Sequence, residues 1–573
     1  MQDPHSMTNK FARTCTALSG KLRGLVSTKA IKPRHDHPVL VVEVLETPWW
    51  VLDAHSKDHP DSPIARLISE SMQSTVTSEQ DEDDLRYWVS SASLMRGVSH
   101  NSHGLKFLNQ LDTMAYPPIW TLAAAHGHHI GVWGSSFSYD WKDFKSQKID
   151  FYLPDKFSPD NFAKPRRTVA YQRILRLLSK FSDQGMDWTF NAFRIQLALT
   201  HFFLSRALRL QIGAIKAFFR NDGLALRFKP KVLVAARLAF YEFMSVYPKH
   251  IPALGTLTLG SLATAMHVSA GPYLESEGLP KKERIKKRAK TLLGQALHEL
   301  DLVVADLMHL AKEENITLVF VSGYGQAAAT LNADTATHAD MWVLNDLDLL
   351  KQAIEFGHSA QQLPAMFPCT SVIFDTNNDR DDMVERLGRI YQPDSNAKLF
   401  HIETGDRTLS IKLMPSAIAL TKKSIRIRSE DGVLISRPIE QIGLRQVRRR
   451  WLSGSHAPGG VLMVHGGGFK AANQRVQPVS ESSIARFVCA LLRIDPPEYM
   501  DTPPEWLEDK LRMLGLTSES SRVGSAQKNR AHFDFQSEMN KLRHRLMVKP
   551  KEMRSKLSPL ERDNALLEVE KFR

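Results

Sequence analysis

The stretch TLVFVSGYG, residues 317–325, is an apolar run that ends in a turn marked by glycines. Residues of the β-branched and aromatic types, bounded by glycine, are typical of a buried strand of a parallel sheet. In an open α/β sheet, ligands and catalytic groups collect at the turn that follows the carboxyl end of such a strand. We therefore expect Gly323, Tyr324 and Gly325 to border the functional site.

Segments with helical and strand patterns alternate on both sides of this stretch. VLVVEVL (39–45) and GVLMV (460–464) read as buried strands, and residues 281–313 carry the 3.6-residue apolar period of a long helix. Such alternation predicts an α/β fold with a mostly parallel central sheet and helices on both faces.

The chain divides into three predicted parts. Residues 1–36 form a basic lead-in, whose first six residues, MQDPHS, read as an addition before a natural start at Met7. Residues 37–501 form the α/β core, with a helical region at 168–247. At about 370–447 short strands alternate with turn signals, which predicts a small strand-rich insert. Residues 502–573 form a basic helical tail.

Composition limits the class of protein. A 43% hydrophobic fraction over 573 residues suffices for a large core. The three scattered cysteines form neither a disulfide framework nor a zinc motif and suit a reducing compartment. The longest uncharged stretch, residues 250–274, is diluted by Gly, Thr, Ser and Pro, so we expect no transmembrane segment. We expect a cytoplasmic protein.

The net charge of +13 is concentrated in three clusters. They are residues 521–573 (net +6), 281–290 (KKERIKKRAK) and 445–450. These clusters are either solvated helix faces and a tail, or surfaces that attract anionic substrates, membranes or nucleic acid. No basic stretch interleaved with aromatics and no zinc-finger spacing occurs, so we expect no sequence-specific nucleic-acid binding. A protein partner for the basic tail stays open.

Several segments carry a family resemblance in sequence order. They are GVSHNSHGL (97–105), TLAAAHGHHIGVWG (121–134), LATAMHVSAGP (262–272), the helix, strand and turn at 290–325, SGSHAPGGVLMVHGGGF (453–469) and SSIARFVCALLRIDPPEYMD (482–501). Together they resemble the alkaline phosphatase superfamily, in particular its type I phosphodiesterase/nucleotide pyrophosphatase branch. The resemblance covers roughly residues 37–501 and implies an alkaline phosphatase-like α/β fold.

The resemblance also implies a chemistry. In that family two divalent metals polarise a phosphoryl or sulfuryl oxygen during an in-line displacement, and a Ser or Thr hydroxyl at a helix N-terminus is the nucleophile. Hard carboxylates and imidazoles hold the metals. The implied substrate is a phosphorylated, sulfated or otherwise anionic small molecule.

This chain matches only part of the metal-ligand pattern. Leu45 stands at the position of the carboxylate that ends the first strand, and Glu46 is the nearest acidic residue. Ala263 replaces the Asp of an Asp-x-x-x-His pair whose histidine is His267, and the closing histidine is His456. Two imidazoles cannot balance the charge of two metals. We therefore expect one divalent ion, zinc or manganese, held by Glu46, His267 and His456, or no metal, with both histidines hydrogen-bonded in a cleft.

Three further positions are candidates for catalysis. The resemblance places the nucleophile near Ser93, with Ser90 and Ser91 left open by a few residues of slack. It also places His103 where the family has a histidine close to the substrate. Tyr324 takes the place of a metal-binding histidine and is a candidate hydrogen-bond donor or general acid.

Two other motifs invite functional interpretation. HGHH (126–129) has the residues of a metal cluster, but it lies between a predicted helix and strand and reads as a surface turn. VHGGGF (464–469) resembles an esterase oxyanion strand, but the chain has no Gly-x-Ser-x-Gly elbow, so we read it as a tight turn.

Three hypotheses therefore remain. The first is a divergent hydrolase or transferase that acts on an anionic small molecule with one metal or none. The second is a pseudoenzyme that serves as a binding or scaffold protein. The third, with least support, is a nucleic-acid or membrane-surface protein that uses the basic clusters.

Overall fold

The structure is a computed structural model that describes residues 37–516 with several internal gaps. The gaps are residues 82–84, 109, 111–115, 139–147, 159–160, 170, 174, 177–230, 329–339, 364, 367–368, 393–395, 415–423, 430, 449–452, 470 and 472–473. The predicted lead-in, much of the predicted helical region 168–247 and most of the predicted tail lie outside the described residues.

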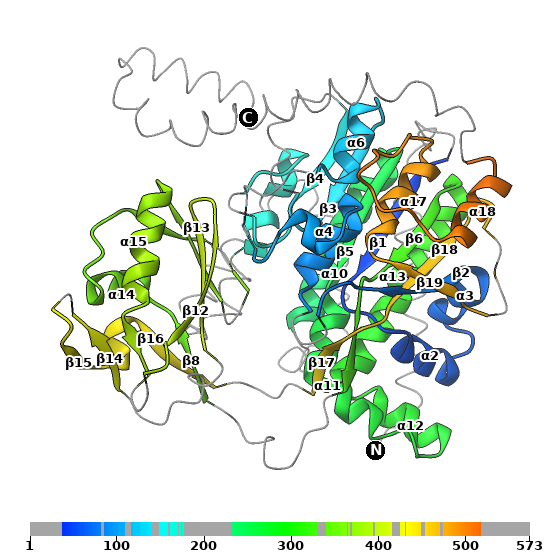
Figure 1. Cartoon of the computed structure of the whole chain (residues 1–573). Coiled ribbons are helices and arrows are strands. Elements are labelled where there is room, and N and C mark those ends of the chain that lie inside the picture. The colour runs from blue at the N-terminus through cyan, green and yellow to red at the C-terminus, as the bar shows by residue number, and fades with distance from the viewer. Residues whose placement is uncertain are drawn as a thin grey trace.

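An eight-stranded sheet forms the centre of the molecule (Figure 1). Its strand order is β19 (Val476–Ser480), β2 (Met72–Thr77), β18 (Gly460–His465), β6 (Thr317–Val321), β1 (Val39–Val44), β5 (Leu254–Leu259), β3 (Ile130–Trp133) and β4 (Ile149–Leu153). Every described pairing is parallel except those of β18, which is antiparallel to both β6 and β2. The predicted mostly parallel sheet is confirmed.

Helices cover both faces of this sheet because its central strands are apolar on both sides. In β1, Leu40 and Val42 point into one apolar core, while Val39 and Val41 point into the other. The first core is covered by α2 (Trp49–Asp58), α3 (Pro63–Glu70), α10 (Lys231–Val246), α11 (Ser261–Leu274) and α13 (Leu292–Glu314). The second is covered by α4 (Tyr87–Arg96), α6 (Ile119–Ala125), α17 (Ser483–Leu491) and α18 (Glu505–Met513).

The strand at 317–322 and its turn fold as predicted, whereas the predicted single helix over 281–313 is two helices, α12 (Lys281–Arg288) and α13 (Leu292–Glu314). The Thr291 hydroxyl caps α13 by accepting the Gly294 N–H at 3.0 Å, and Asn315 ends the helix in the left-handed conformation. Strand β6 follows at once, and all five of its residues are buried. Its carboxyl end turns through Ser322 and Gly323 into the short strand β7 (Gly325–Ala328).

A second unit, residues 340–448, has its own sheets and its own apolar core (Figure 1, left). Its strands are β8 (Asp340–Leu344), β9 (Ala360–Leu363), β10 (Thr370–Phe374), β11 (Ile390–Tyr391), β12 (Phe400–Gly405), β13 (Thr408–Leu413), β14 (Ser424–Arg428), β15 (Leu434–Pro438) and β16 (Leu444–Arg448), and its helices are α14 (Leu347–Ala353) and α15 (Asn377–Leu387). All pairings that the structure describes here are antiparallel. The unit begins at β8, earlier in the chain than the predicted range of 370–447.

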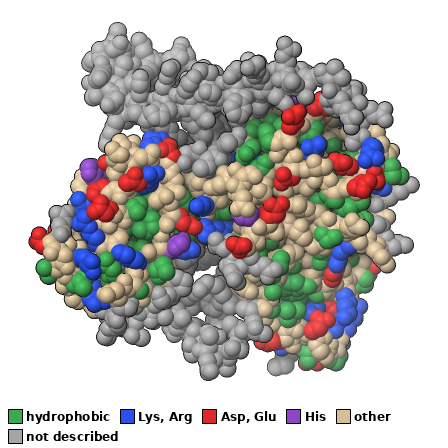
Figure 2. Space-filling view, viewed as in Figure 1, with side chains coloured by type: hydrophobic (Ala, Val, Ile, Leu, Met, Phe, Trp, Pro, Cys, Tyr) green, Lys and Arg blue, Asp and Glu red, His purple; other side chains and the backbone are tan. Residues whose placement is uncertain are grey.

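Polar side chains join the two units. Arg86, which precedes α4 in the core, donates to Glu403 of β12 at 2.8 Å, and both side chains are 14% exposed. The space-filling view shows Lys and Arg, acidic and His side chains gathered where the units meet (Figure 2). Met366 of the insert also packs against the apolar cluster of Leu85 and Tyr87. The insert therefore lies against the segment that begins α4.

Two observations bear on the surroundings of the protein. Cys369 and Cys489 are free thiols. Among the described helices, none combines the length and the apolar character needed to cross a membrane.

Candidate metal centre

Glu46 lies just beyond the carboxyl end of β1, in a backbone conformation that is rare for its residue type. Its φ of 56° is in the left-handed region, which costs a non-glycine residue on the order of 1 kcal/mol. The residue after Glu46 fixes this turn against the end of β6, because the Thr47 N–H donates to the Ser322 hydroxyl at 3.0 Å. This turn carries the Glu46 carboxylate into the molecule, where the residue is 6% exposed.

His267 lies in the middle of α11, where the helix bends. Ser269 departs from helical geometry, and the His267 carbonyl accepts a hydrogen bond from the Ser453 N–H at 2.7 Å. The His267 Nδ1–H donates to the Gly454 carbonyl at 3.1 Å. Because a carbonyl only accepts, this bond leaves Nε2 of the neutral ring as the available ligand atom.

His456 lies on β17 (Gly454–Ala457), which pairs with β7 so that His456 is opposite Gln326. Its Nδ1–H donates to the Leu85 carbonyl at 2.6 Å, just before α4. The Nε2 atom faces Glu46 Oε2, to which it donates while the ring is protonated, and it becomes a ligand atom when that proton is lost. Histidines that bind metals are commonly oriented through their second nitrogen in this way.

The three side chains converge. Their candidate ligand atoms lie within 4.8 Å of one another, with Glu46 Oε2 at 3.1 Å from His267 Nε2 and 3.3 Å from His456 Nε2. Ligand atoms about 2.0–2.1 Å from a tetrahedral zinc lie roughly 3.4 Å apart. Two histidines and one carboxylate also form a ligand set that is used at catalytic zinc and non-haem iron sites. The residues therefore fit a single divalent ion.

Gln326 is a fourth member of the cluster, one that the sequence did not single out. Its Nε2 donates to Glu46 Oε2 at 2.6 Å and to the Ala263 carbonyl at 3.1 Å, while its Oε1 has no hydrogen-bond partner among the described residues. The residue is 1% exposed. A buried amide at this place orients the carboxylate between the two imidazoles. The signal in the sequence was its position two residues after Tyr324, on the strand that faces the closing histidine.

The charge distribution favours an ionised carboxylate. Burial raises the pKa of Glu46, but hydrogen bonds and attraction from His267 and His456 outweigh it and hold that pKa far below its usual range. Burial lowers the pKa of His456, and the Glu46 carboxylate outweighs burial and leaves it raised. The imidazole side chains of His267 and His456 are 28% and 31% exposed, whereas the Glu46 side chain is 6% exposed. The cluster thus opens to solvent on its histidine side.

Tyr324 borders this cluster. Its ring lies 5.1 Å from the His456 ring, centroid to centroid, and the residue is 1% exposed. Its hydroxyl has no hydrogen-bond partner among the described residues. Burial raises its pKa well above the usual value, and the nearby Glu46 carboxylate raises it further. Tyr324 is therefore a neutral phenol with an O–H available for donation.

The space beside Gly323, where the resemblance implies a second metal-binding carboxylate, is filled. A Cβ at Gly323 would overlap the Ser90 hydroxyl and lie 2.5 Å from Glu481 Oε2. The Ser90 hydroxyl donates to that carboxylate, and Glu481 is 1% exposed. Burial raises the pKa of Glu481 to about 7, against the lowering effect of hydrogen bonds from Ser90 and Ser78. Among the described residues, no second group of three His, Cys, Asp or Glu side chains comes within ligand distance.

Glu481 was not predicted from the sequence either, because it follows an edge strand more than 150 residues beyond Gly323. A comparable pair lies nearby in the core. The Ser91 hydroxyl donates to Glu43 of β1, and Thr258 Oγ1 donates to the same carboxylate at 3.1 Å. Burial raises the pKa of Glu43 to about 7, despite these hydrogen bonds.

Ser93 and His103 form a separate, fully enclosed pair. Ser93 lies in the second turn of α4, not at its N-terminus, and its hydroxyl is 3.1 Å from His103 Nε2. The Leu105 N–H donates to His103 Nδ1 at 3.0 Å, so the proton of the neutral ring is on Nε2 and points to Ser93. Burial, with the charges of Arg96 and His100, lowers the pKa of His103 to about 3. In this arrangement His103 cannot take a proton from Ser93, and neither residue contacts Glu46, His267 or His456.

The two remaining motifs lie on turns. HGHH spans the connection between α6 and β3, and none of its histidines belongs to the metal-competent group found among the described residues. Gly466, Gly467 and Gly468 of VHGGGF all have positive φ, which only glycine adopts readily, in the turn after β18.

The solved structures that are similar to this chain include one human and two murine structures. No protein-family model and no curated protein matches the chain. Human ectonucleotide pyrophosphatase/phosphodiesterase 5 is 12% identical, with 83% of this chain and 99% of that chain covered and a TM-score of 0.38. The murine protein is also 12% identical over 83% of this chain and 100% of that chain, with TM-scores of 0.37 for an inactive variant in complex with AMP and 0.36 for another structure.

These neighbours carry the same family name as the resemblance given from the sequence. The structure of this chain itself gives the sheet order, the parallel pairings and the convergence of Glu46, His267 and His456. The chain is thus an α/β protein similar to nucleotide pyrophosphatase/phosphodiesterases, with one three-ligand cluster among its described residues.

Proposed function

We propose that the chain is a divergent phosphodiesterase-like hydrolase or transferase that uses a single divalent metal, zinc or manganese. One observation carries this proposal: Glu46, His267 and His456 place their ligand atoms at the separations of one metal site, with both imidazoles already oriented by backbone carbonyls. A divalent ion there would supply Lewis-acid polarisation of an ester oxygen.

The residues of the chain have distinct roles in this proposal. His267 and His456 present Nε2, and Glu46 supplies the negative charge that a divalent ion needs. Gln326 fixes the Glu46 carboxylate. Tyr324, a neutral phenol whose pKa is raised well above its usual value, donates a hydrogen bond to an ester oxygen and keeps its proton.

The proposed substrate is an anionic ester of a small molecule. A cationic centre that opens on its histidine side attracts a phosphoryl or sulfuryl group, and the net charge of +13 favours its approach. The murine neighbour in complex with AMP is an example of such a ligand in a similar protein. The free thiols Cys369 and Cys489 agree with a reducing, cytoplasmic setting.

A pseudoenzyme is the second candidate. The space beside Gly323 is filled, and Ser93 is enclosed. No described serine at the N-terminus of α4 is therefore placed to act as a nucleophile, which favours this candidate. In that case the cluster binds a ligand or metal without turnover, and the insert serves as the partner surface.

Elemental analysis of the purified protein and a panel of phosphate, phosphodiester and sulfate esters test the proposal. We expect about one zinc or manganese per chain, a thermal shift on adding either metal, and ester turnover. The variants Glu46→Gln and His456→Ala should lose metal affinity by at least roughly a hundredfold, since each removes a ligand.

His126→Ala is the matched control, because His126 lies on the surface turn of HGHH. Metal binding without turnover of any ester would favour the pseudoenzyme. If neither metal binds, or if His126→Ala weakens binding as much as His456→Ala, the single-metal proposal is wrong.

A further inference from the structure

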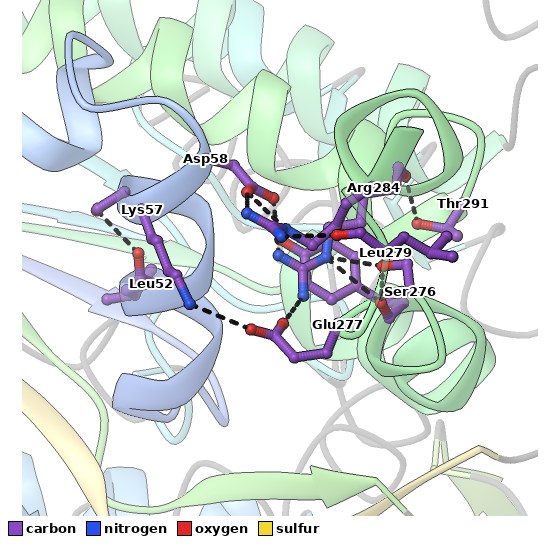
Figure 3. A network of polar contacts seen from close by, with 11 residues as sticks. Leu52, Lys57, Asp58, Ser276, Glu277, Leu279, Arg284 and Thr291 are labelled. Atoms are coloured by element: carbon purple, nitrogen blue, oxygen red, sulfur yellow. Dashed lines mark hydrogen bonds and ion pairs between the residues drawn. The ribbon is translucent and has the colours of Figure 1, made fainter. Parts of the chain in front are cut away.

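The basic helix α12 (Lys281–Arg288) is anchored by its two arginines. Arg284 Nε donates to Asp58 Oδ1 at 2.9 Å, and Arg288 donates to Asp58 Oδ2 at 2.7 Å. The Arg288 guanidinium also lies 4.4 Å from the centre of the Tyr273 ring. Figure 3 shows Arg284 directed at Asp58, at the end of α2, with Lys57 and Glu277 facing one another beside them. The helix is therefore attached to both α2 and the carboxyl end of α11.

This attachment fixes the orientation of α12. The side chain of Asp58 is 1% exposed, and those of Arg284 and Arg288 are 10% and 4% exposed. Burial raises the pKa of Asp58, but the hydrogen bonds and charges of both arginines outweigh it and leave the pKa lowered. A buried ion pair is weak evidence for stability. Here its hydrogen bonds fix the directions of the Arg284 and Arg288 guanidinium groups. With its arginines held inside, α12 presents its lysines and Glu283 to solvent.

The outward side of α12 is a surface of lysines. Lys281, Lys282, Lys286, Lys287 and the following Lys290 are all exposed. Lys287 lies 3.8 Å from Glu275, while no ion pair is described for the other four. We define the α12 surface as these five lysines with Lys57, Arg284, Arg288, Asp58, Glu275, Glu277 and Glu283, a net charge of +4.

We propose that the α12 surface binds the phosphate backbone of nucleic acid without reading its sequence. Lys282 and Lys286 stand one helical turn apart, about 6 Å along the axis, so both can reach phosphates of one strand, which are spaced about 3.4 Å along the duplex axis. The helix exposes no large apolar side chain, which a helix lying on a lipid bilayer requires. It also carries no aromatic side chain on which bases stack. The expected binding is therefore electrostatic: the lysines contact phosphates and release the counterions bound there.

Fluorescence anisotropy with a labelled random-sequence DNA duplex and the full chain tests this inference. We expect the affinity to fall with salt at a log–log slope of about −2 to −4, as contact with two to four phosphates predicts. The variant Lys282→Glu/Lys286→Glu should bind about tenfold or more weakly at low salt and reduce the slope by about 2.

The control variant is Lys312→Glu/Lys510→Glu, which changes the net charge equally at sites away from α12. Circular dichroism melting checks that both variants fold. If Lys282→Glu/Lys286→Glu does not fold, Lys282→Gln/Lys286→Gln is measured in its place. Selective loss in the α12 variant supports the inference. Equal losses in both variants, an absence of duplex binding, or binding to phosphatidylserine vesicles but not to duplex would each overturn it. The outcome is independent of the metal centre, because no residue of the α12 surface belongs to it.

Discussion

The carboxyl ends of β1 and β6 lie side by side in the central sheet, and they differ in what the chain places there. At the end of β1, a left-handed turn brings the carboxylate of Glu46 between His267 and His456. At the end of β6, Gly323 presents no side chain, and Ser90 and Glu481 fill the space. The backbone at the end of β1 thus turns a carboxylate toward two imidazoles. At the end of β6, packing has closed the space that a further ligand would need.

The largest expected effect comes from placing a carboxylate at the end of β6. Gly323→Asp would put a Cβ onto the Ser90 hydroxyl and a second charge beside Glu481. We expect a loss of about 3–5 kcal/mol in the free energy of unfolding, or insoluble protein, measured by urea titration.

Gly357→Asp is the matched control for this variant. Gly357 is exposed, and a Cβ at this position would have no other atom within 4 Å, so this change should be nearly neutral. A stable Gly323→Asp protein that gains a second metal would show that the space at β6 is open.

The pH dependence of stability tests the buried state of Glu481. Its pKa is raised to about 7 from an ordinary 4.5, so between these pH values the folded chain keeps a proton that the unfolded chain loses. Stability therefore falls as the pH rises through this window, by up to about 3 kcal/mol for this group. Glu481→Gln, which stays neutral, should be more stable than the parent at pH 8 and similar to it at pH 4. The exposed Glu498→Gln should leave the pH profile of unfolding unchanged.

Gln326→Met tests the support of Glu46 at the end of β1. The change keeps the length of the side chain but removes the N–H that donates to Glu46 at 2.6 Å. We expect a roughly 10- to 100-fold loss in metal affinity, as for other residues that orient a ligand, with a loss of about 1–2 kcal/mol in stability. Titration calorimetry with zinc measures it, with the exposed Gln446→Met as control. An unchanged affinity would mean that the turn at Glu46 orients the carboxylate without Gln326.

Ser93→Ala should have the smallest effect. Its hydroxyl accepts from His103 and contacts no member of the metal cluster, so we expect a loss of about 1 kcal/mol and unchanged metal affinity. A loss of turnover at unchanged melting temperature would instead support the catalytic role that the resemblance assigns to Ser93.

Much of the architecture followed from local pattern. The apolar runs at 39–45, 317–322 and 460–464 became neighbouring buried strands, because a fully apolar strand is stable only with both faces covered. The antiparallel direction of β18 was not predicted, since an apolar run carries no information about its orientation. The pairing of β8 with β16 was not predicted either, because these strands lie about a hundred residues apart in the chain.

The candidate site was predictable only in its chemistry. His267 and His456 were singled out as retained imidazoles and Glu46 as the nearest carboxylate, and the structure brings all three together. Glu481 gave no local signal, and the position of Gln326 two residues after Tyr324 does not show that its amide is buried, because a buried Gln or Glu has the same letter as an exposed one. Their roles depend on which distant side chain they meet.

The sequence by itself determined the alternation of helices and buried strands and the supply of imidazoles, because both depend on residue type and short-range period. The tertiary structure decided that Glu46 turns inward, that Ser90 and Glu481 occupy the space beside Gly323, and that α12 buries its arginines and exposes its lysines. These outcomes depend on contacts between residues far apart in the chain, which form only when strand register and helix packing bring them within a few ångströms.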